Sequence, residues 1–268
     1  MVSKPTTQIT DIVGNIPYRL ALAGGWIDQP YVSKFNPSAP GSMVTVQVVP
    51  EFRFLDRSGI CGSTRRIALE MWKGQVPQSR DKMELVRELY QAENEGLTEP
   101  SGSQDMIGLV YPGVNRLDYD TNHEGGYFPV HIESNNDPDI AAWLESVLYL
   151  VPVMTRPDGY NPLGIQNFDP EWIARLGKTG QDCYDAIINK DLSALGDSFN
   201  DCMLCWKTIL PHVVAHETIK MDLMELLAFY QDHYAGAMFS GCGGGYFYVV
   251  YDKPVPGGFQ VAVRTEQT

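Results

Sequence analysis

The apolar residues of this chain change their spacing several times, and the order of these changes limits the folds open to it. Residues 18–23 and 43–49 show the apolar or alternating pattern of half-buried strands. Residues 64–72 follow a glycine turn and are typical of a helix, and two further strand-like stretches lie at 245–251 and 259–263. Because strands and helices mix without regular βαβ alternation, the pattern predicts an α+β fold.

Capping residues mark where helices begin. Ser79 precedes an apolar stripe at helical spacing and is the predicted N-cap of that helix. Asp137-Pro138 and Asp169-Pro170 each pair a capping carboxylate with a proline suited to the first turn. We therefore expect helices to start at these three places.

A short apolar run at 147–154 predicts a buried strand near the middle of the chain. The residues after it are mainly helical in pattern up to about Tyr234. We expect two domains, residues 1–150 and residues 151–268.

Charge and cysteine usage narrow the functional classes. The 268 residues carry a net charge of −13, which argues against nucleic acid or an anionic membrane as the main partner, since both attract basic patches. No apolar run is long enough to span a bilayer, and the first residues lack the apolar core of a signal peptide. An odd, sparse set of cysteines indicates reduced thiols and a cytoplasmic protein. The five are Cys61, Cys183, Cys202, Cys205 and Cys242.

The first candidate segment runs from Pro17 to Tyr31. A predicted strand ends at Gly24-Gly25, and Trp26 and Asp28 follow directly after the end of this strand. An aspartate at this position can accept hydrogen bonds from substrate hydroxyls, and a tryptophan can pack against the face of a substrate ring. An ordinary strand turn with a capping aspartate is the alternative.

The second segment is Gly59-Ile-Cys-Gly-Ser-Thr-Arg-Arg66, which leads into a predicted helix. Small residues at a helix N-terminus leave backbone N–H groups to bind an anion, and the helix dipole adds to this. The hydroxyl of Ser63 or Thr64 can ligate a metal ion, and the guanidinium of an arginine can bind a phosphate. Plain N-capping by Ser63 is the alternative.

The third segment spans residues 93–105, where a helix ends and a Pro/Gly turn precedes Asp105. Such an aspartate suits the role of proton acceptor in phosphoryl transfer, and a glutamate on the preceding helix suits a metal ion. An acidic, solvated helix end is the alternative.

The fourth segment, residues 236–250, places Gly241, Gly243, Gly244 and Gly245 between two apolar strands. So many glycines indicate a backbone that approaches something closely, which favours a functional loop over a simple hairpin turn.

Taken in order, these segments resemble the GHMP kinase superfamily, most closely its branch of heptose-phosphate kinases and fucokinases. The pattern Arg-x-x-x-x-Gly-Gly-Trp-x-Asp-x-Pro at 19–30 is similar to the first motif, and Gly-Ser-Thr at 62–64 to the core of the second. Residues 93–105 resemble the segment that carries the catalytic aspartate, and 240–245 the glycine-rich third motif. Residues 148–156 resemble, in shortened form, a strand that ends in Thr-x-x-x-Arg.

The resemblance implies a fold and an activity. It implies a ribosomal-S5-like N-terminal domain packed on a ferredoxin-like C-terminal domain. The implied reaction transfers the γ-phosphate of ATP, with Mg²⁺, to a hydroxyl of a sugar, sugar phosphate or related polyol. The implied partners are ATP and this sugar-like substrate, and a homodimer is left open.

The resemblance also implies residue roles. Asp105 is the implied general base with Arg19 beside it, and Glu93 and Ser63 are the implied Mg²⁺ ligands. The ATP phosphates are assigned to Gly62, Ser63, Thr64 and Arg65. The substrate is assigned to Trp26, Asp28, Gly243, Gly244 and Gly245.

Two departures from the family pattern stand out. Ile60 occupies the first glycine position of the second motif, and Arg65 and Arg66 replace small residues. Because successive helical residues point about 100° apart, we expect one arginine to reach a phosphate and the other to lie on the outer face. Two surface arginines are the alternative.

The stretch between the first two motifs, part of which contacts adenine in the family, is also short here. A catalytically altered or inactive binding or regulatory protein on the same fold is therefore the second hypothesis.

Overall fold

The computed structural model describes residues 13–54 and 57–266. Its first sheet has four antiparallel strands in chain order: β1 (Tyr18–Ala21), β2 (Gly41–Val48), β3 (Val114–Tyr119) and β4 (His131–Asn135). The predicted strands at 18–23 and 43–49 correspond to β1 and β2.

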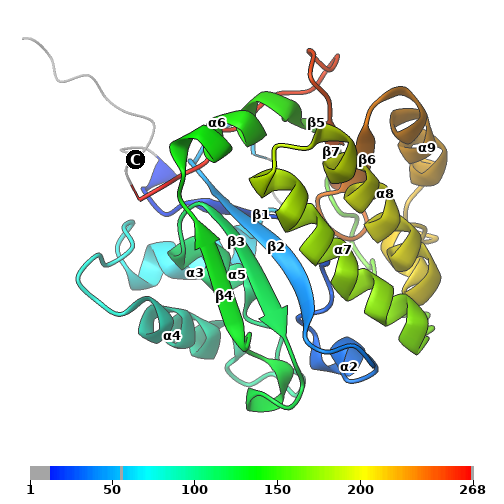
Figure 1. The fold of residues 1–268 in the computed structure, drawn as a ribbon. Helices are drawn as coiled ribbons and strands as arrows, with labels where there is room; N and C mark the ends of the chain where they lie inside the picture. The colour runs from blue at the N-terminus through cyan, green and yellow to red at the C-terminus, as the bar shows by residue number, and fades with distance from the viewer. Residues whose placement is uncertain (1–12, 55–56, 267–268) are drawn as a thin grey trace, which may run out of the picture.

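Three helices of the N-terminal half pack together beside this sheet (Figure 1): α3 (Gly62–Met71), α4 (Lys82–Asn94) and α5 (Gln104–Val110). Helix α5 contacts both β1 and β2. The predicted cap of α4 was wrong by two residues, because Asp81 and not Ser79 accepts the hydrogen bond from the backbone N–H of Glu84.

A second sheet of three antiparallel strands follows, in the order β5 (Leu148–Met154), β7 (Gly245–Val250) and β6 (Gly236–Phe239). Helix α8 (Leu192–Ile209) contacts β6 and β7, and α9 (Leu223–His233) contacts β6. Two antiparallel sheets with helices confirm the α+β prediction.

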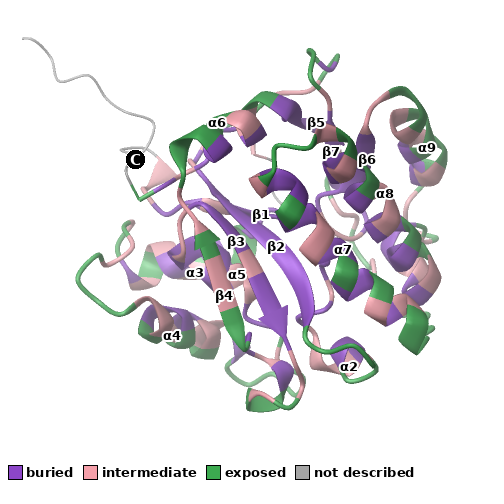
Figure 2. Ribbon diagram, in the orientation of Figure 1, coloured by how far each residue is buried: buried purple, intermediate pink, exposed green. Residues whose placement is uncertain are grey.

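Helix α7 (Pro170–Ile188) pairs with α8 and lies across β2 (Figure 1). The contact is backbone to backbone, because a Cβ atom on Gly180 would lie only 2.0 Å from the carbonyl oxygen of Ser42. With α5 and α7 both packed on it, β2 is buried at every position (Figure 2).

The predicted aspartate caps are present. Asp137 accepts from the N–H of Asp139 at the start of α6 (Pro138–Val147), and Asp169 accepts from the N–H groups of Glu171 and Trp172 at the start of α7. The remaining short helices are α2 (Pro30–Ser33), η1 (Glu124–Gly126) and η2 (Pro211–Val213).

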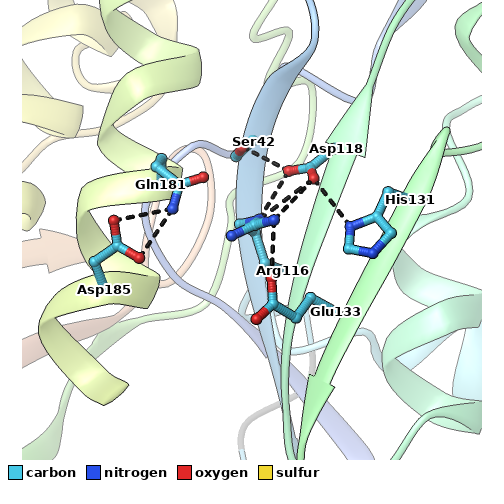
Figure 3. Close-up of polar contacts among 7 residues, drawn as sticks. All are labelled: Ser42, Arg116, Asp118, His131, Glu133, Gln181 and Asp185. Carbon is cyan, nitrogen blue, oxygen red and sulfur yellow. Dashed lines mark hydrogen bonds and ion pairs between the residues drawn. The ribbon is translucent and has the colours of Figure 1, made fainter. Parts of the chain in front are cut away.

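Charged residues on β3 and β4 lie beside α7 and are paired with one another (Figure 3). Asp118 accepts from the Ser42 hydroxyl at 2.7 Å and from the Arg116 guanidinium, whose Nη2 atom also lies 2.9 Å from a Glu133 carboxylate oxygen. The His131 ring nitrogen lies 3.3 Å from Asp118. Asp118 is buried, and the hydrogen bonds and ion pairs from these partners compensate its charge.

The C-terminal residues join the two sheets. The predicted strand at 259–263 forms only single bridges, from Phe259 to Leu150 and from Val263 to Val48. Both sheets thus meet this segment, although the second sheet begins at Leu148, close to the proposed domain boundary. Among residues 13–54 and 57–266, no helix has the length and apolar character needed to cross a membrane.

Candidate active site

The four segments singled out in the sequence meet at one cavity of about 630 Å³. The loop after β1, the loop before α3, the start of α5 and the loop between β6 and β7 all contribute to its wall. Their contributions are Arg19, Ala21, Gly25, Trp26, Asp28, Gln29, Tyr31, Gly59, Cys61, Gly62, Ser63, Arg66, Ser101, Gln104, Asp105, Ser240, Gly241 and Cys242.

An ion pair between Arg19 and Asp105 lies at this cavity. Arg19 is buried at the base of β1 and also points Nη1 at the carbonyl oxygen of Gly59, 3.4 Å away. Asp105 occupies the first turn of α5 with 29% of its side chain exposed. Glycine at position 108 is what lets α5 lie on the Arg19 side chain, because a Cβ atom there would sit 2.0 Å from the arginine Cγ. The ion pair thus fixes the Asp105 carboxylate in a position that is accessible from the cavity.

Asp28 is a second carboxylate in the wall, and it is fully buried. Its Oδ2 atom accepts from the side-chain amide of Gln29 at 2.8 Å, while Oδ1 has no partner among the described residues. Burial raises the pKa of Asp28 to about 6, and the positive charge of Arg19 partly offsets this. An unpartnered acceptor in a cavity wall suits a ligand hydroxyl.

The N-terminus of α3 opens on the same cavity. Cys61, the N-cap residue, has the left-handed φ of 68° and makes no side-chain cap, so Gly62 and Ser63 present uncapped first-turn N–H groups. No acidic side chain lies in this first turn. Free backbone N–H groups at the N-terminus of a helix favour the binding of an anion.

Behind this turn stands Glu93, at the end of α4. Its carboxylate lies 3.4 Å from the Ser63 hydroxyl and accepts from the Thr64 hydroxyl at 2.6 Å. The two segments predicted to share a metal ion are therefore in contact.

Comparison with known proteins rests on structure alone, because no protein-family model and no curated protein sequence matches the chain. Lactococcus lactis galactokinase complexed with galactose superposes with a TM-score of 0.60 at 12% identity, over 94% of this chain and 93% of the other. A D-glycero-D-manno-heptose 1-phosphate kinase from Bacteriodes thetaiotaomicron gives 0.54 at 13% identity, over 93% and 95%. The Methanococcus jannaschii mevalonate kinase gives 0.51 at 11% identity, over 88% and 89%.

The chain has the GHMP kinase fold. The fold predicted from the four motifs is thereby confirmed. At these identities the likeness concerns the fold, and the chemistry has to be argued from the residues in the cavity.

Within this GHMP kinase fold, the two arginines of α3 point in different directions, as expected, but the assignment of Arg65 to the phosphates needs correction. Arg65 is buried and donates to the carbonyl oxygens of Ile16 at 2.9 Å and Val13 at 2.7 Å, with its guanidinium carbon 4.3 Å from the Tyr18 ring centre. Arg66 is exposed and lines the cavity. Arg66 is therefore the arginine available to a phosphate.

The glycine-rich loop of the GHMP kinase fold also differs from expectation. Gly243, Gly244 and Gly245 do not line the cavity, and their close approaches are to the protein itself. A Cβ atom on Gly243 would lie 2.4 Å from the Tyr160 ring, and one on Gly245 would lie 2.1 Å from the Ser58 carbonyl oxygen. Both residues also have positive φ. These glycines pack the loop against its neighbours, and the cavity wall is formed by the residues just before them, from Ser240 to Cys242.

A Mg²⁺ ion fits the oxygen atoms at the start of α3. Mg²⁺ sites commonly combine one or two carboxylates with substrate phosphates and water, and Glu93 with Ser63 supplies one carboxylate and one hydroxyl. Thr64 is fully buried, and neither Thr64 nor Glu93 is among the residues that line the cavity; Glu93 borders it through its contact with Ser63. The Thr64 hydroxyl donates to Glu93 and is not exposed to the cavity.

Several wall residues had no recognisable signal in the sequence. Trp206 comes from α8, where its Nε1 donates to the carbonyl oxygen of Gly25 at 3.0 Å. Arg57 and Leu163 come from loops without a motif of their own, and Arg156 ends the family-like segment 148–156, to which no site role was assigned. Only the fold brings them to the cavity, so residue spacing does not identify them.

Proposed function

We propose that this protein is an ATP-dependent kinase that phosphorylates a hydroxyl of a sugar, sugar phosphate or related polyol. The observation that carries the proposal is the Arg19–Asp105 ion pair, because it presents a carboxylate in the same cavity as the uncapped start of α3. A proton acceptor and an anion site in one cavity are what transfer of a phosphoryl group to an alcohol requires.

In the proposed reaction the acceptor hydroxyl gives its proton to Asp105 as its oxygen bonds to the γ-phosphorus. The bond from that phosphorus to the β,γ-bridging oxygen breaks, and ADP leaves. The first-turn N–H groups of Gly62 and Ser63, with Arg66, face the phosphates. Glu93 and Ser63 hold Mg²⁺, which when bound neutralises phosphate charge.

The other wall suits a polyhydroxylated acceptor. The free Oδ1 of Asp28 accepts a hydrogen bond from a hydroxyl, and Trp26 offers an aromatic surface beside it. All five cysteines are unpaired thiols, which supports a reducing, cytoplasmic location.

A coupled assay of ADP release over a panel of sugars, sugar phosphates and polyols tests the proposal, with calorimetry of Mg-ATP binding beside it. We expect heat on adding Mg-ATP and acceptor-dependent ADP release. No binding heat and no melting shift at millimolar Mg-ATP would refute the kinase reading.

A second candidate function is a binding or regulatory protein that transfers no phosphate. It is favoured by the direct passage from β2 to α3 through residues 49–61, whose described part contains no helix or strand. Saturable ligand binding without ADP release for any acceptor would support this candidate.

A further inference from the structure

The charge of the cavity is opposite to the charge of the chain. The whole sequence has 33 acidic and 20 basic residues, but the charged residues of the cavity wall are four arginines and two aspartates. They are Arg19, Arg57, Arg66, Arg156, Asp28 and Asp105. A positive cavity in an acidic protein indicates that the ligands are anions.

Three of the arginines are accounted for without a new ligand. Arg19 is paired with Asp105, and Arg57 at the rim is paired with Asp158. Arg66 lies on α3, where the proposed function places the phosphates of ATP. Arg156 is the cation that remains.

Arg156 is held in one orientation but keeps its outer edge open. Its Nε donates to the carbonyl oxygen of Cys242 at 3.0 Å, and its guanidinium carbon lies 5.7 Å from the Tyr160 ring centre. Its backbone N–H donates to the Arg57 carbonyl oxygen at 3.2 Å. No residue of the described chain accepts from its Nη atoms. A fixed guanidinium with two free Nη groups matches a phosphate or a carboxylate.

Contacts relate this arginine to the reacting end of the cavity. The Gly59 carbonyl accepts from Arg19, the partner of Asp105. A Cβ atom on Gly241 would lie 2.9 Å from the Gly59 Cα and 3.8 Å from the Arg156 Nη2. Asp105, through Arg19, and Arg156 are thus both linked to the contact between Gly59 and Gly241, and both line the same cavity.

We propose that the acceptor carries an anionic group, a phosphate or a carboxylate, which binds the Nη edge of Arg156 while a hydroxyl of the same molecule faces Asp105. This rests on the proposed function of the cavity in phosphoryl transfer. Neutral sugars are then poor acceptors.

Matched acceptors test this proposal. Glucose, glucose 6-phosphate and glucuronate share a ring and differ at one carbon, as do galactose, galactose 6-phosphate and galacturonate. We expect kcat/KM for the preferred anion to exceed that for its neutral parent by about 10². Comparing kcat/KM for the sugar 6-phosphates with kcat/KM for the uronates shows whether the site prefers a phosphate or a carboxylate. Equal kcat/KM for neutral and anionic acceptors overturns the anion site and leaves the kinase proposal standing.

Variants separate recognition from packing. Arg156→Gln should reduce kcat/KM for the anionic acceptor by roughly 10- to 100-fold and abolish the preference over the neutral parent. Arg175→Gln is the matched control, since Arg175 is paired with Asp201 on α8, outside the cavity, and should leave both values unchanged. An equal loss for neutral and anionic acceptors would mean that Arg156 only holds the Cys242 loop.

Equilibrium binding keeps the anion site testable without catalysis. Calorimetry with glucose 6-phosphate and galactose 6-phosphate, in the absence of ATP, should show binding to the wild type that Arg156→Gln weakens about tenfold or more and Arg66→Gln does not. If no acceptor releases ADP and Mg-ATP does not bind, the kinase proposal fails while this result still decides the anion site. If neither sugar phosphate binds the wild type more tightly than Arg156→Gln, the anion site is absent.

Discussion

Asp28 should destabilise the folded protein at neutral pH, and its removal provides a quantitative test of the site. Burial raises the pKa of this carboxyl to about 6 in the fold, against an ordinary value of 3.8. Each pH unit between the two values corresponds to about 1.4 kcal/mol. The ionised carboxylate therefore lowers the free energy of unfolding by about 3 kcal/mol at pH 7.

The sign of the pH dependence follows from which state binds the proton more tightly. Well below pH 3.8 the carboxyl is protonated in both the folded and the unfolded chain, so it costs no stability. As the pH rises from about 4 to about 6, the unfolded chain releases the proton first, and the wild type loses stability over this window. Above about pH 6 the loss is complete.

Asp28→Asn removes the charge but introduces an amide group. Its oxygen replaces the acceptor of Gln29, whereas its NH₂ replaces the unpartnered Oδ1 and leaves a buried donor unsatisfied, at about 1 kcal/mol. The net expectation is a gain of about 2 kcal/mol at pH 7 that vanishes near pH 4 to 5. Binding of the acceptor should weaken at the same time, because the hydroxyl loses its anionic partner.

Denaturant unfolding of both proteins at pH 7 and at pH 4.5 measures the effect, with Asp232→Asn as the control. Asp232 is exposed on α9, and its substitution should change stability by less than about 0.5 kcal/mol at either pH. A variant Asp28→Asn that is no more stable than wild type at pH 7, or whose gain persists at pH 4.5, would refute the reasoning.

Three further predictions concern catalysis and the nucleotide. Asp105→Asn should lower the turnover of ADP release by about 10² or more and leave Mg-ATP affinity intact, because the proton acceptor is lost; near-normal turnover would place the base elsewhere. Glu93→Gln should raise the Mg²⁺ concentration for half-maximal activity more than it changes acceptor affinity, since Mg²⁺ prefers an anionic oxygen, and an unchanged Mg²⁺ titration would contradict the metal role. Arg66→Ala should weaken ATP binding by roughly tenfold in calorimetry, whereas Arg65→Met should chiefly lower the melting temperature, because Arg65 bonds to backbone carbonyls. The opposite pattern would restore the phosphate role to Arg65.

The sequence identified the elements whose apolar pattern is regular, and the structure shows why others were missed. Strand β3 buries Asn115 and Asp118 among its apolar residues, so its pattern does not read as a strand. Strand β4 lies at the sheet edge and is largely polar. Conversely, the predicted strand at 259–263 has suitable residues but pairs only at single bridges.

For the site, motif order predicted which segments come together but not which way each residue faces. Neighbouring side chains on α3 point about 100° apart. A shift of one residue along the helix therefore separates the buried Arg65 from Arg66, which lines the cavity. The glycines after Cys242 signalled a close approach correctly, yet the approach is to Tyr160 and Ser58 within the fold. Arg156 ends the family-like segment 148–156, but the sequence did not indicate that its side chain lines the cavity.

The backbone contact between α7 and β2 has a consequence for protein engineering. A Cβ atom on Gly24 would lie 2.2 Å from the Ser42 carbonyl oxygen and 3.0 Å from the Gly180 Cα, so the turn that carries Trp26 and Asp28 is clamped between strand and helix. Added atoms at these glycines would shift the acceptor wall itself. A designer who wants a new acceptor should keep this turn and randomise the opposite loops, where Arg57, Arg156 and Leu163 reach the cavity from irregular segments.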